Sequence, residues 1–296
     1  MRSEELEKKL EEYIENLRIY GQKQESTLIK YTQVIRDFIK WLEEKELTQA
    51  VAISYPVYLK DSTTDKKAFE TSTVNTDIKI LNEFFKYLEL DIYIKQIKQQ
   101  IKYNNKNVLT LEEVHRLQRK AKENNNMRLY YIMETLLKTG IRIGELKYFT
   151  VENLQAIDNE EPELIVYNKG KERPVTVIPE LKNELLKYAK KENITTGTIF
   201  PSQRAAGKML TASAIWKQMQ KTAAACKIKK VKVHAHSFRH LFAQLYSQQD
   251  GASTEELADI FGHSDTNTTR TYMRTSAKEK KRRIQGVNFG QKPRKK

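Results

Sequence analysis

Five side chains that can handle protons, anions or a nucleophilic attack lie in three short segments of the sequence. Arg142 lies in TGIRIGEL, and His236 and Arg239 lie in HAHSFRHLFAQ. Two residues that are three apart share a face of a helix, so His236 and Arg239 can address one oxyanion. Close to the end of the chain, FGHSDTNTTRTYM holds His263 and, nine positions later, Tyr272.

These residue types suit an attack on a phosphodiester. A tyrosine hydroxyl has a pKa near ~10, so Tyr272 needs nearby cations to act as a nucleophile at neutral pH. Two arginines, two histidines and Lys169, at the expected tip of a hairpin, can supply them. Glu145 follows Arg142 by one helical turn and can hold its guanidinium group. Guanidinium forks match phosphate oxygens, so the target favoured by this set is a phosphate ester.

Each of these signals is weak when it stands alone. Arg142 could be a surface arginine that pairs with Glu145, and most lysines at hairpin tips are simply solvated. His234, His236 and His240 together raise the alternative of a metal site. No cysteine or carboxylate lies close enough in the sequence to complete such a site, and the zinc spacings are missing. We therefore expect no metal and no other cofactor, and a structural role for His240.

The composition indicates a polyanionic partner. The 296 residues include 53 lysines and arginines against 38 acids, so the formal net charge is 53 − 38 = +15. Such an excess favours nucleic acid over a membrane surface, although charge alone leaves open a basic protein without this role. The mean hydropathy is −0.70, and no apolar run approaches the ~20 residues that span a bilayer. A single cysteine, Cys226, fits a reducing compartment, so we expect a cytoplasmic, nucleoid-associated protein.

The apolar pattern predicts a mainly α chain with a small antiparallel sheet. Three helical stripes occur in the first hundred residues, around Leu10, Ile35 and Leu81. The pattern breaks within KYNNKNVLT and resumes at a capping box, Thr110 with Glu113. The following segments predict a helix that stops at Gly140, two strands joined by a turn at 168–171, and helices around 215–219, 241–246 and after Ser253.

Together these segments resemble the tyrosine recombinases, the phage-integrase and Xer-type family. The resemblance covers nearly the whole chain, beginning with STLIKYTQVIRDFIKWL in the first hundred residues. Six positions match the catalytic groups of that family in order: Arg142, Lys169, His236, Arg239, His263 and Tyr272. Glu145 matches the neighbouring acid of the family. Gly144 and Phe238 stand where serine and leucine are more usual, and neither change removes a catalytic group.

The resemblance implies the domains and the partners. It implies a helical core-binding DNA-binding domain over residues 1–103, a linker over 104–109, a catalytic domain over 110–288 and a basic tail over 289–296. The expected substrate is double-stranded DNA with an inverted-repeat core site. A homo-tetramer on two such sites would exchange strands through a 3′-phosphotyrosyl intermediate, with accessory DNA-bending or directionality proteins as further possible partners. The core-binding helices begin near Met1, so no separate arm-type DNA site is expected.

Two alternatives remain at this point. A type IB topoisomerase shares the tyrosine chemistry, but that group usually has a lysine where His236 stands. A DNA-binding regulator that has lost catalysis is the other alternative, and the presence of all six groups argues against it.

The segment after Tyr272 generates a first prediction. Residues 278–296 hold nine basic residues and Glu279, a net charge of +8, yet Ile284, Val287 and Phe289 interrupt them. By resemblance, this apolar part packs against a neighbouring protomer.

Replacing these three residues with serine should leave binding to one DNA site intact and abolish pairing of two sites, as measured by gel mobility. Deletion from Lys292 onward should instead weaken binding mainly at higher salt, since it removes phosphate contacts. Normal recombination by the serine variant would contradict the packing hypothesis.

Overall fold

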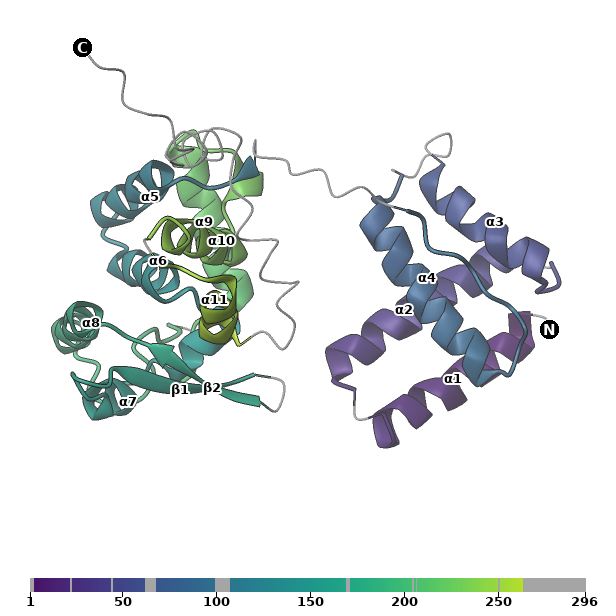
Figure 1. Cartoon of the computed structure of the whole chain (residues 1–296), viewed down its shortest axis with the longest axis horizontal. Helices are drawn as coiled ribbons and strands as arrows, with labels where there is room; N and C mark the ends of the chain where they lie inside the picture. Colours follow the sequence, from purple (N-terminus) through teal and green to yellow (C-terminus); the bar gives the residue numbers. More distant parts are fainter. Residues whose placement is uncertain are drawn as a thin grey trace, which may run out of the picture. The chain divides into compact units, whose positions relative to one another are not determined.

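The computed structural model describes residues 3–21, 23–43, 45–61, 68–98, 107–168, 171–203, 205, 207–249 and 251–262. The chain divides into two compact units, Met1–Lys102 and Tyr103–Lys296. The linker expected over 104–109 falls at the start of the second unit. Each unit has its own buried core and is described by itself (Figure 1).

The first unit is built from helices. Its elements are α1 Ser3–Ile19, α2 Glu25–Leu42, α3 Gln49–Lys60 and α4 Thr71–Tyr87. The three predicted stripes correspond to α1, α2 and α4, whose apolar faces meet in one core with Phe38 and Phe84 fully buried. Helix α3 was not predicted as a separate helix. Pro56 lies inside α3, which lacks a clear apolar stripe, so its helical period is hard to recognise.

Residues 90–98 have no regular secondary structure and are tied to α4 by side-chain amides. Asn82 accepts from the backbone N–H of Ile94 and donates to its carbonyl, both at 2.9 Å. Asn75 makes the same pair of bonds with Ile97, at 2.8 and 2.9 Å. Each amide thus satisfies a backbone donor and acceptor that a strand partner would otherwise satisfy.

The second unit is mainly helical and contains a two-stranded sheet. Its elements in chain order are α5 Leu111–Glu123, α6 Met127–Thr139, the 3-10 helix η2 Ile143–Tyr148, α7 Val151–Ala156, β1 Glu163–Asn168, β2 Lys171–Thr176, α8 Pro179–Lys191, α9 Ala212–Ala225, the 3-10 helix η3 Lys230–Lys232, α10 Ala235–Tyr246 and α11 Thr254–Phe261. The predicted fold class, mainly α with a small antiparallel sheet, is confirmed. None of the described helices is long and apolar enough to cross a membrane.

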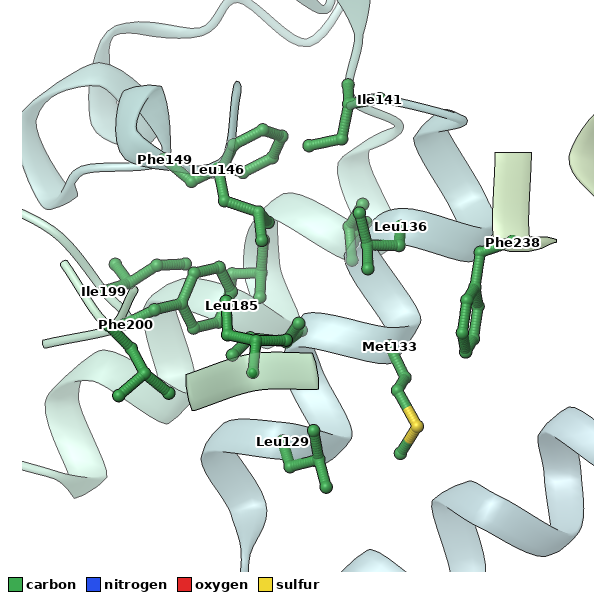
Figure 2. Close-up of a cluster of buried hydrophobic side chains, with 14 of the residues drawn as sticks. Leu129, Met133, Leu136, Ile141, Leu146, Phe149, Leu185, Ile199, Phe200 and Phe238 are labelled. Carbon is green, nitrogen blue, oxygen red and sulfur yellow. The ribbon is translucent and has the colours of Figure 1, made fainter. Parts of the chain in front are cut away.

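Helix α6 forms the centre of the second core. It packs against α5, α8, α9 and α10. Figure 2 shows Leu129, Met133 and Leu136 of this helix among the buried side chains, with Phe238 of α10 also in the cluster. Because α6 is surrounded in this way, its C-terminal end has a fixed position, and this end fixes the position of the residues that directly follow it.

Local signals placed several helix ends correctly. Thr110 accepts from the backbone N–H of Glu113, and the Glu113 carboxylate accepts from the N–H of Thr110, so the predicted capping box is present. Ser253 caps the start of α11 by accepting from the N–H of Glu256. Gly140 ends α6 in the left-handed conformation, with φ +61°.

The hairpin also has the predicted strands. Glu163 pairs with Thr176, Val166 with Arg173, and Asn168 with Lys171. Residues 169 and 170, which join the strands, lie outside the described residues.

Gly140 generates a stability prediction. A Cβ atom at this position would lie 2.9 Å from both Phe242 Cδ1 and Phe261 Cε1. Gly140→Ala should therefore lower the free energy of unfolding through left-handed strain, about 1–2 kcal/mol, and through overpacking, about 1–3 kcal/mol more. Urea unfolding followed by circular dichroism measures the loss.

Gly197→Ala is the matched control. Gly197 has φ +72°, and no atom lies within 4 Å of the position that its Cβ would occupy. This variant should show the backbone strain alone. Equal losses in the two variants would mean that the aromatic rings around Gly140 do not restrict it.

Candidate active site

The turn after α6 places Arg142 beside a buried carboxylate. Gly140 reverses the chain, and Arg142 then becomes the N-cap of η2. Glu145 Oε2 accepts from the backbone N–H of Arg142 at 2.7 Å, and Oε1 accepts from Nη1 of Arg142 at 3.3 Å. The Arg142 side chain is 36% exposed, whereas that of Glu145 is 2% exposed. The acid is therefore an internal support, and the arginine reaches the surface.

A second arginine, Arg173 of β2, also contacts Glu145. Its Nη2 donates to Glu145 Oε2 at 2.7 Å, and its Nη1 donates to the carbonyl of Ile260 at 2.8 Å. Burial works to raise the pKa of Glu145. The backbone N–H of Arg142 and the charge of Arg173 outweigh this effect and hold the pKa below its ordinary value. Glu145 is thus ionised at neutral pH.

The sequence analysis did not identify Arg173, although one signal was available. In a strand, alternate residues face the same side of the sheet. Arg173 alternates with Val175 and Val177, and all three are buried. An arginine at a core-facing strand position needs a partner because an unpaired buried charge is costly. The pattern therefore indicated a buried ion pair, but it could not name Glu145.

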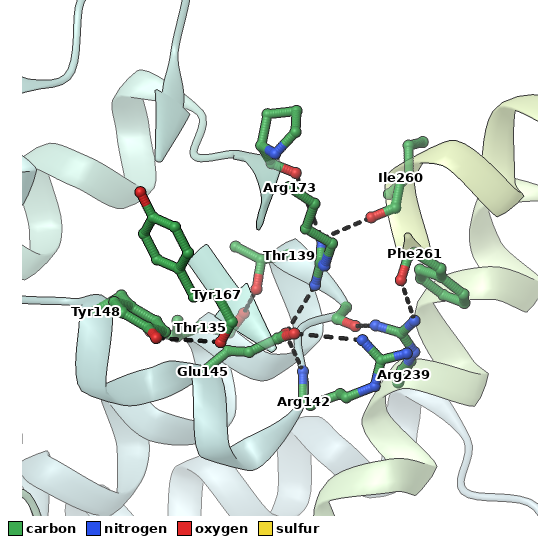
Figure 3. A network of polar contacts seen from close by, with 12 residues as sticks. Thr135, Thr139, Arg142, Glu145, Tyr148, Tyr167, Arg173, Arg239, Ile260 and Phe261 are labelled. Atoms are coloured by element: carbon green, nitrogen blue, oxygen red, sulfur yellow. Dashed lines mark hydrogen bonds and ion pairs between the residues drawn. The ribbon is translucent and has the colours of Figure 1, made fainter. Parts of the chain in front are cut away.

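Arg239 is held in the interior by the ends of two helices. It is 1% exposed, and its Nη1 donates to the carbonyl of Gly140 at 2.7 Å. Its Nη2 donates to the carbonyl of Phe261 at 2.9 Å, and its Cζ lies 3.7 Å from the centre of the Phe261 ring. Helix C-terminal carbonyls carry partial negative charge, so α6 and α11 both stabilise this cation. Figure 3 shows Arg142, Glu145, Arg173 and Arg239 in one network.

His236 lies on α10 with Arg239, as predicted, but the two side chains differ in exposure: His236 is exposed and Arg239 is buried. Partial desolvation lowers the pKa of His236, and the positive charges of Arg239 and Arg142 lower it further. The lowered pKa keeps His236 neutral at neutral pH. A neutral imidazole can accept or donate one proton.

The other two histidines of this segment have structural contacts. His234 is the N-cap of α10, and its Nδ1 accepts from the backbone N–H of Ser237 at 3.2 Å. The rings of His236 and His240 meet edge to face at 4.7 Å. Burial, together with the nearby histidines and Arg239, lowers the pKa of His240 to about 4.

Three of the predicted catalytic residues lie outside the described residues: Lys169, His263 and Tyr272. Two of them directly follow a described residue in the sequence. Strand β1 ends at Asn168, one position before Lys169, and Gly262 caps α11 one position before His263.

The charges in the described network suit a phosphate that gains negative charge during a reaction. Three guanidinium groups and one carboxylate, those of Arg142, Arg173, Arg239 and Glu145, give 3 − 1 = +2. A phosphodiester carries one negative charge and develops a second in a pentacoordinate transition state. Fixed positive groups in a partly dry site stabilise that state because they need no reorganisation.

The phage integrase family model matches residues 107–279. A tyrosine recombinase of Pseudothermotoga lettingae is 26% identical over 265 residues, which cover 86% of this chain and 89% of that protein. The tyrosine recombinase XerA of Pyrococcus furiosus is 25% identical over 284 residues, which cover 95% of this chain and 94% of that protein.

Solved structures share the fold. The XerH site-specific recombinase bound to a palindromic difH substrate, in a post-cleavage complex, has a TM-score of 0.71 at 17% identity, over 94% of this chain and 83% of that one. The Tn1549 transposon integrase, in complex with circular intermediate DNA, has a TM-score of 0.71 at 18% identity, over 94% of this chain and 98% of that one.

The family match covers more than half of the sequence, so this chain belongs to the phage integrase family. The prediction of a tyrosine recombinase, an enzyme that cuts and rejoins DNA, is confirmed. The topoisomerase and regulator alternatives are not favoured. The matched range includes Lys169, His263 and Tyr272.

The half-buried imidazole of His240 generates a prediction on pH. Its pKa in the folded chain is about 4, below the ordinary value of 6.5. Between these values the unfolded chain binds a proton that the folded chain does not, so the free energy of unfolding falls as the pH drops through this window. Each pH unit inside this window changes the stability by about 1.4 kcal/mol, so His240→Gln should remove about 2 kcal/mol of the fall between about pH 7 and about pH 5. Urea unfolding at these two pH values measures the difference.

His115→Gln serves as the control, because His115 is exposed on α5. This variant should keep the pH dependence of the natural chain. An unchanged pH dependence in His240→Gln would show that His240 is not held neutral in the folded state.

Proposed function

We propose that the chain is a site-specific recombinase that cuts DNA through a covalent 3′-phosphotyrosyl intermediate. The observation that carries this proposal is the placement of two arginines next to the end of α6. Glu145 holds Arg142 just after this helix, and Arg239, 97 positions later in the sequence (239 − 142), donates to the carbonyls of Gly140 and Phe261. The family match supports it, because the matched range contains both arginines and Tyr272.

In the proposed reaction, the hydroxyl oxygen of Tyr272 attacks a DNA phosphorus atom. A tyrosyl O–P bond forms as the bond from phosphorus to the 5′ oxygen breaks, and the tyrosine gives up its proton. The leaving 5′ oxygen takes a proton and becomes a hydroxyl group. A 5′-hydroxyl of another strand then attacks the phosphotyrosine, which restores Tyr272 and a phosphodiester. Because bond energy is kept in the intermediate, the reaction needs no ATP.

Arg142, Arg239 and His263 stabilise the charge of the transition state in this proposal. Arg142 is the most exposed of the four charged residues of the described network. The Glu145 carboxylate holds it by accepting hydrogen bonds from the backbone N–H and the guanidinium group of Arg142. Arg239 supplies a fixed positive charge whose position is set by two carbonyls and an aromatic ring.

Lys169 and His236 handle protons. Lys169, next to the end of β1 in sequence, is the proposed general acid for the leaving 5′ oxygen, since a lysine on a turn can reach a bound substrate. His236 assists as a neutral imidazole, the state that follows from its lowered pKa.

The substrate is DNA, and the proposal extends to the roles of the two units, the number of copies and the further partners. The first unit acts as a core-binding DNA-binding domain, the second unit is catalytic up to residue 288, and the residues from 289 form a basic tail. Four copies of the chain act on two inverted-repeat core sites, with accessory DNA-bending or directionality proteins as further partners. With DNA as the substrate, the proposed location is the cytoplasm, in association with the nucleoid.

The test uses covalent capture. Tagged protein is incubated with a pool of random-sequence duplexes, denatured, and recovered with any attached DNA, which is amplified and sequenced. The wild-type chain should enrich a duplex with an inverted repeat, and the adduct should form in EDTA. Tyr272→Phe should fold, bind the enriched duplex and form no adduct, because only the nucleophilic oxygen is missing.

Tyr246→Phe is the matched control. Tyr246 lies on α10, and its ring stacks on that of Phe242. Its removal should leave the adduct unchanged. An adduct that persists in Tyr272→Phe, or disappears in Tyr246→Phe, would refute the assignment of the nucleophile.

A further inference from the structure

We propose that Arg173 is a positioning residue for the reaction, one that sets the place of Arg142 and of the last turn of α11. This inference rests on the proposed function. It adds a residue that is not among the six catalytic positions or their neighbouring acid. Its basis is a set of contacts that joins three elements, β2, η2 and α11, through one side chain.

The first contact is with the support of Arg142. A single oxygen, Glu145 Oε2, accepts from Nη2 of Arg173 and from the backbone N–H of Arg142, both at 2.7 Å. The carboxylate is almost fully buried, so it cannot exchange either partner for water at low cost. Loss of Arg173 would remove one of the hydrogen bonds that Glu145 Oε2 accepts. The carboxylate would then turn toward Arg142 or draw in water, and either change moves the guanidinium of Arg142.

The second contact is with the end of α11. Arg173 Nη1 donates to the carbonyl of Ile260 at 2.8 Å. The next carbonyl, that of Phe261, accepts from Arg239 at 2.9 Å. The last turn of α11 is therefore fixed by two different arginines on consecutive carbonyls. Figure 3 shows Arg173 between Glu145 and Ile260, with Arg239 on Phe261.

The third contact is a steric one. Gly262 has φ +60°, and a Cβ atom there would overlap Cδ of Arg173. The aliphatic part of Arg173 therefore lies directly against the backbone of the residue that precedes His263. A glycine meets two requirements at this position, the left-handed conformation and the close approach of the arginine.

This arrangement is not what stability alone requires. Arg173 is 8% exposed and occupies a core-facing strand position beside Val175. A buried ion pair is often no more stabilising than apolar residues of similar volume. An apolar residue would fill the space, but it could not hold Glu145 and Ile260 in fixed relation to each other. The guanidinium can, because its planar fork presents two donors in a rigid geometry.

The experiment compares binding with cleavage. The duplex enriched by covalent capture is incubated with excess protein, and the single-turnover rate of adduct formation is measured alongside the Kd for the same duplex. The variants are Arg173→Met, Arg173→Lys, Glu145→Gln and the double variant Arg173→Met/Glu145→Gln. Circular dichroism melting selects a temperature at which every variant is folded.

A positioning role predicts a specific pattern. Arg173→Met should lower the cleavage rate on the order of 10²-fold, the size expected from a small displacement of catalytic groups, while the Kd changes less than about 3-fold. Arg173→Lys keeps the charge and one contact, so its rate should lie between those of Arg173→Met and the wild-type chain. The rate loss of the double variant should be smaller than the product of the two single losses, because Arg173 acts in part through Glu145.

Arg128→Met is the matched control. Arg128 also donates to a backbone carbonyl, that of Pro201 at 2.5 Å, and among the described residues it has no hydrogen bond or ion pair with Arg142, Glu145, Arg173 or Arg239. This variant should lower the melting temperature and leave the cleavage rate within about 2-fold.

Three results would overturn the proposal: a folded Arg173→Met that cleaves at the wild-type rate, a rate that falls only as the Kd rises, or effects of Arg173→Met and Glu145→Gln that multiply. Failure of the proposed function looks different. In that case the wild-type chain itself forms no adduct that depends on Tyr272, and both proposals are lost.

Discussion

The ionised carboxylate of Glu145 is the constraint on which the second unit depends. A charge that is 1% exposed must be compensated within the protein, because the cost of removing it from water is several kcal/mol. Compensation comes from a backbone N–H and a guanidinium of Arg142 and from the guanidinium of Arg173. These partners belong to the turn after α6 and to β2. The carboxylate can be satisfied only when helix, turn and sheet are all in place.

The C-terminal ends of helices compensate the buried positive charges in the same way. Arg239 would be costly to bury alone, but the carbonyls of Gly140 and Phe261 belong to the C-terminal ends of α6 and α11. Arg173 uses the carbonyl of Ile260, again at the end of α11. Partial negative charge at helix C-termini lets the fold hold positive groups in position before any DNA is bound. In the proposed reaction, these prearranged cationic groups would stabilise the charge of the transition state without reorganisation.

Local sequence signals predicted much of the fold where the determining contacts are themselves local. The capping box at Thr110 and the stop at Gly140 each depend on residues within one helical turn, and the structure has both. The signals failed where local preference and tertiary packing disagree. Helix α3 contains Pro56 and has no clear apolar stripe, and it was not predicted as a separate helix. Its residues Ala52, Tyr55 and Leu59 are buried in the core of the first unit, and packing there stabilises the helix.

The sequence by itself indicated the class of chemistry, because its arginine, histidine, lysine and tyrosine residues occur in the order and local context of the catalytic groups of the tyrosine recombinases. It also determined that Arg142 and Glu145 interact, since three positions along a turn bring them together. Only the tertiary structure decided that Arg239 is buried at the ends of α6 and α11, and that Arg173 shares an oxygen of Glu145. Arg173 and Glu145 are 28 positions apart, and Arg239 and Gly140 are 99 apart. Contacts at such separations depend on how whole elements pack, and no local preference of the chain encodes that packing.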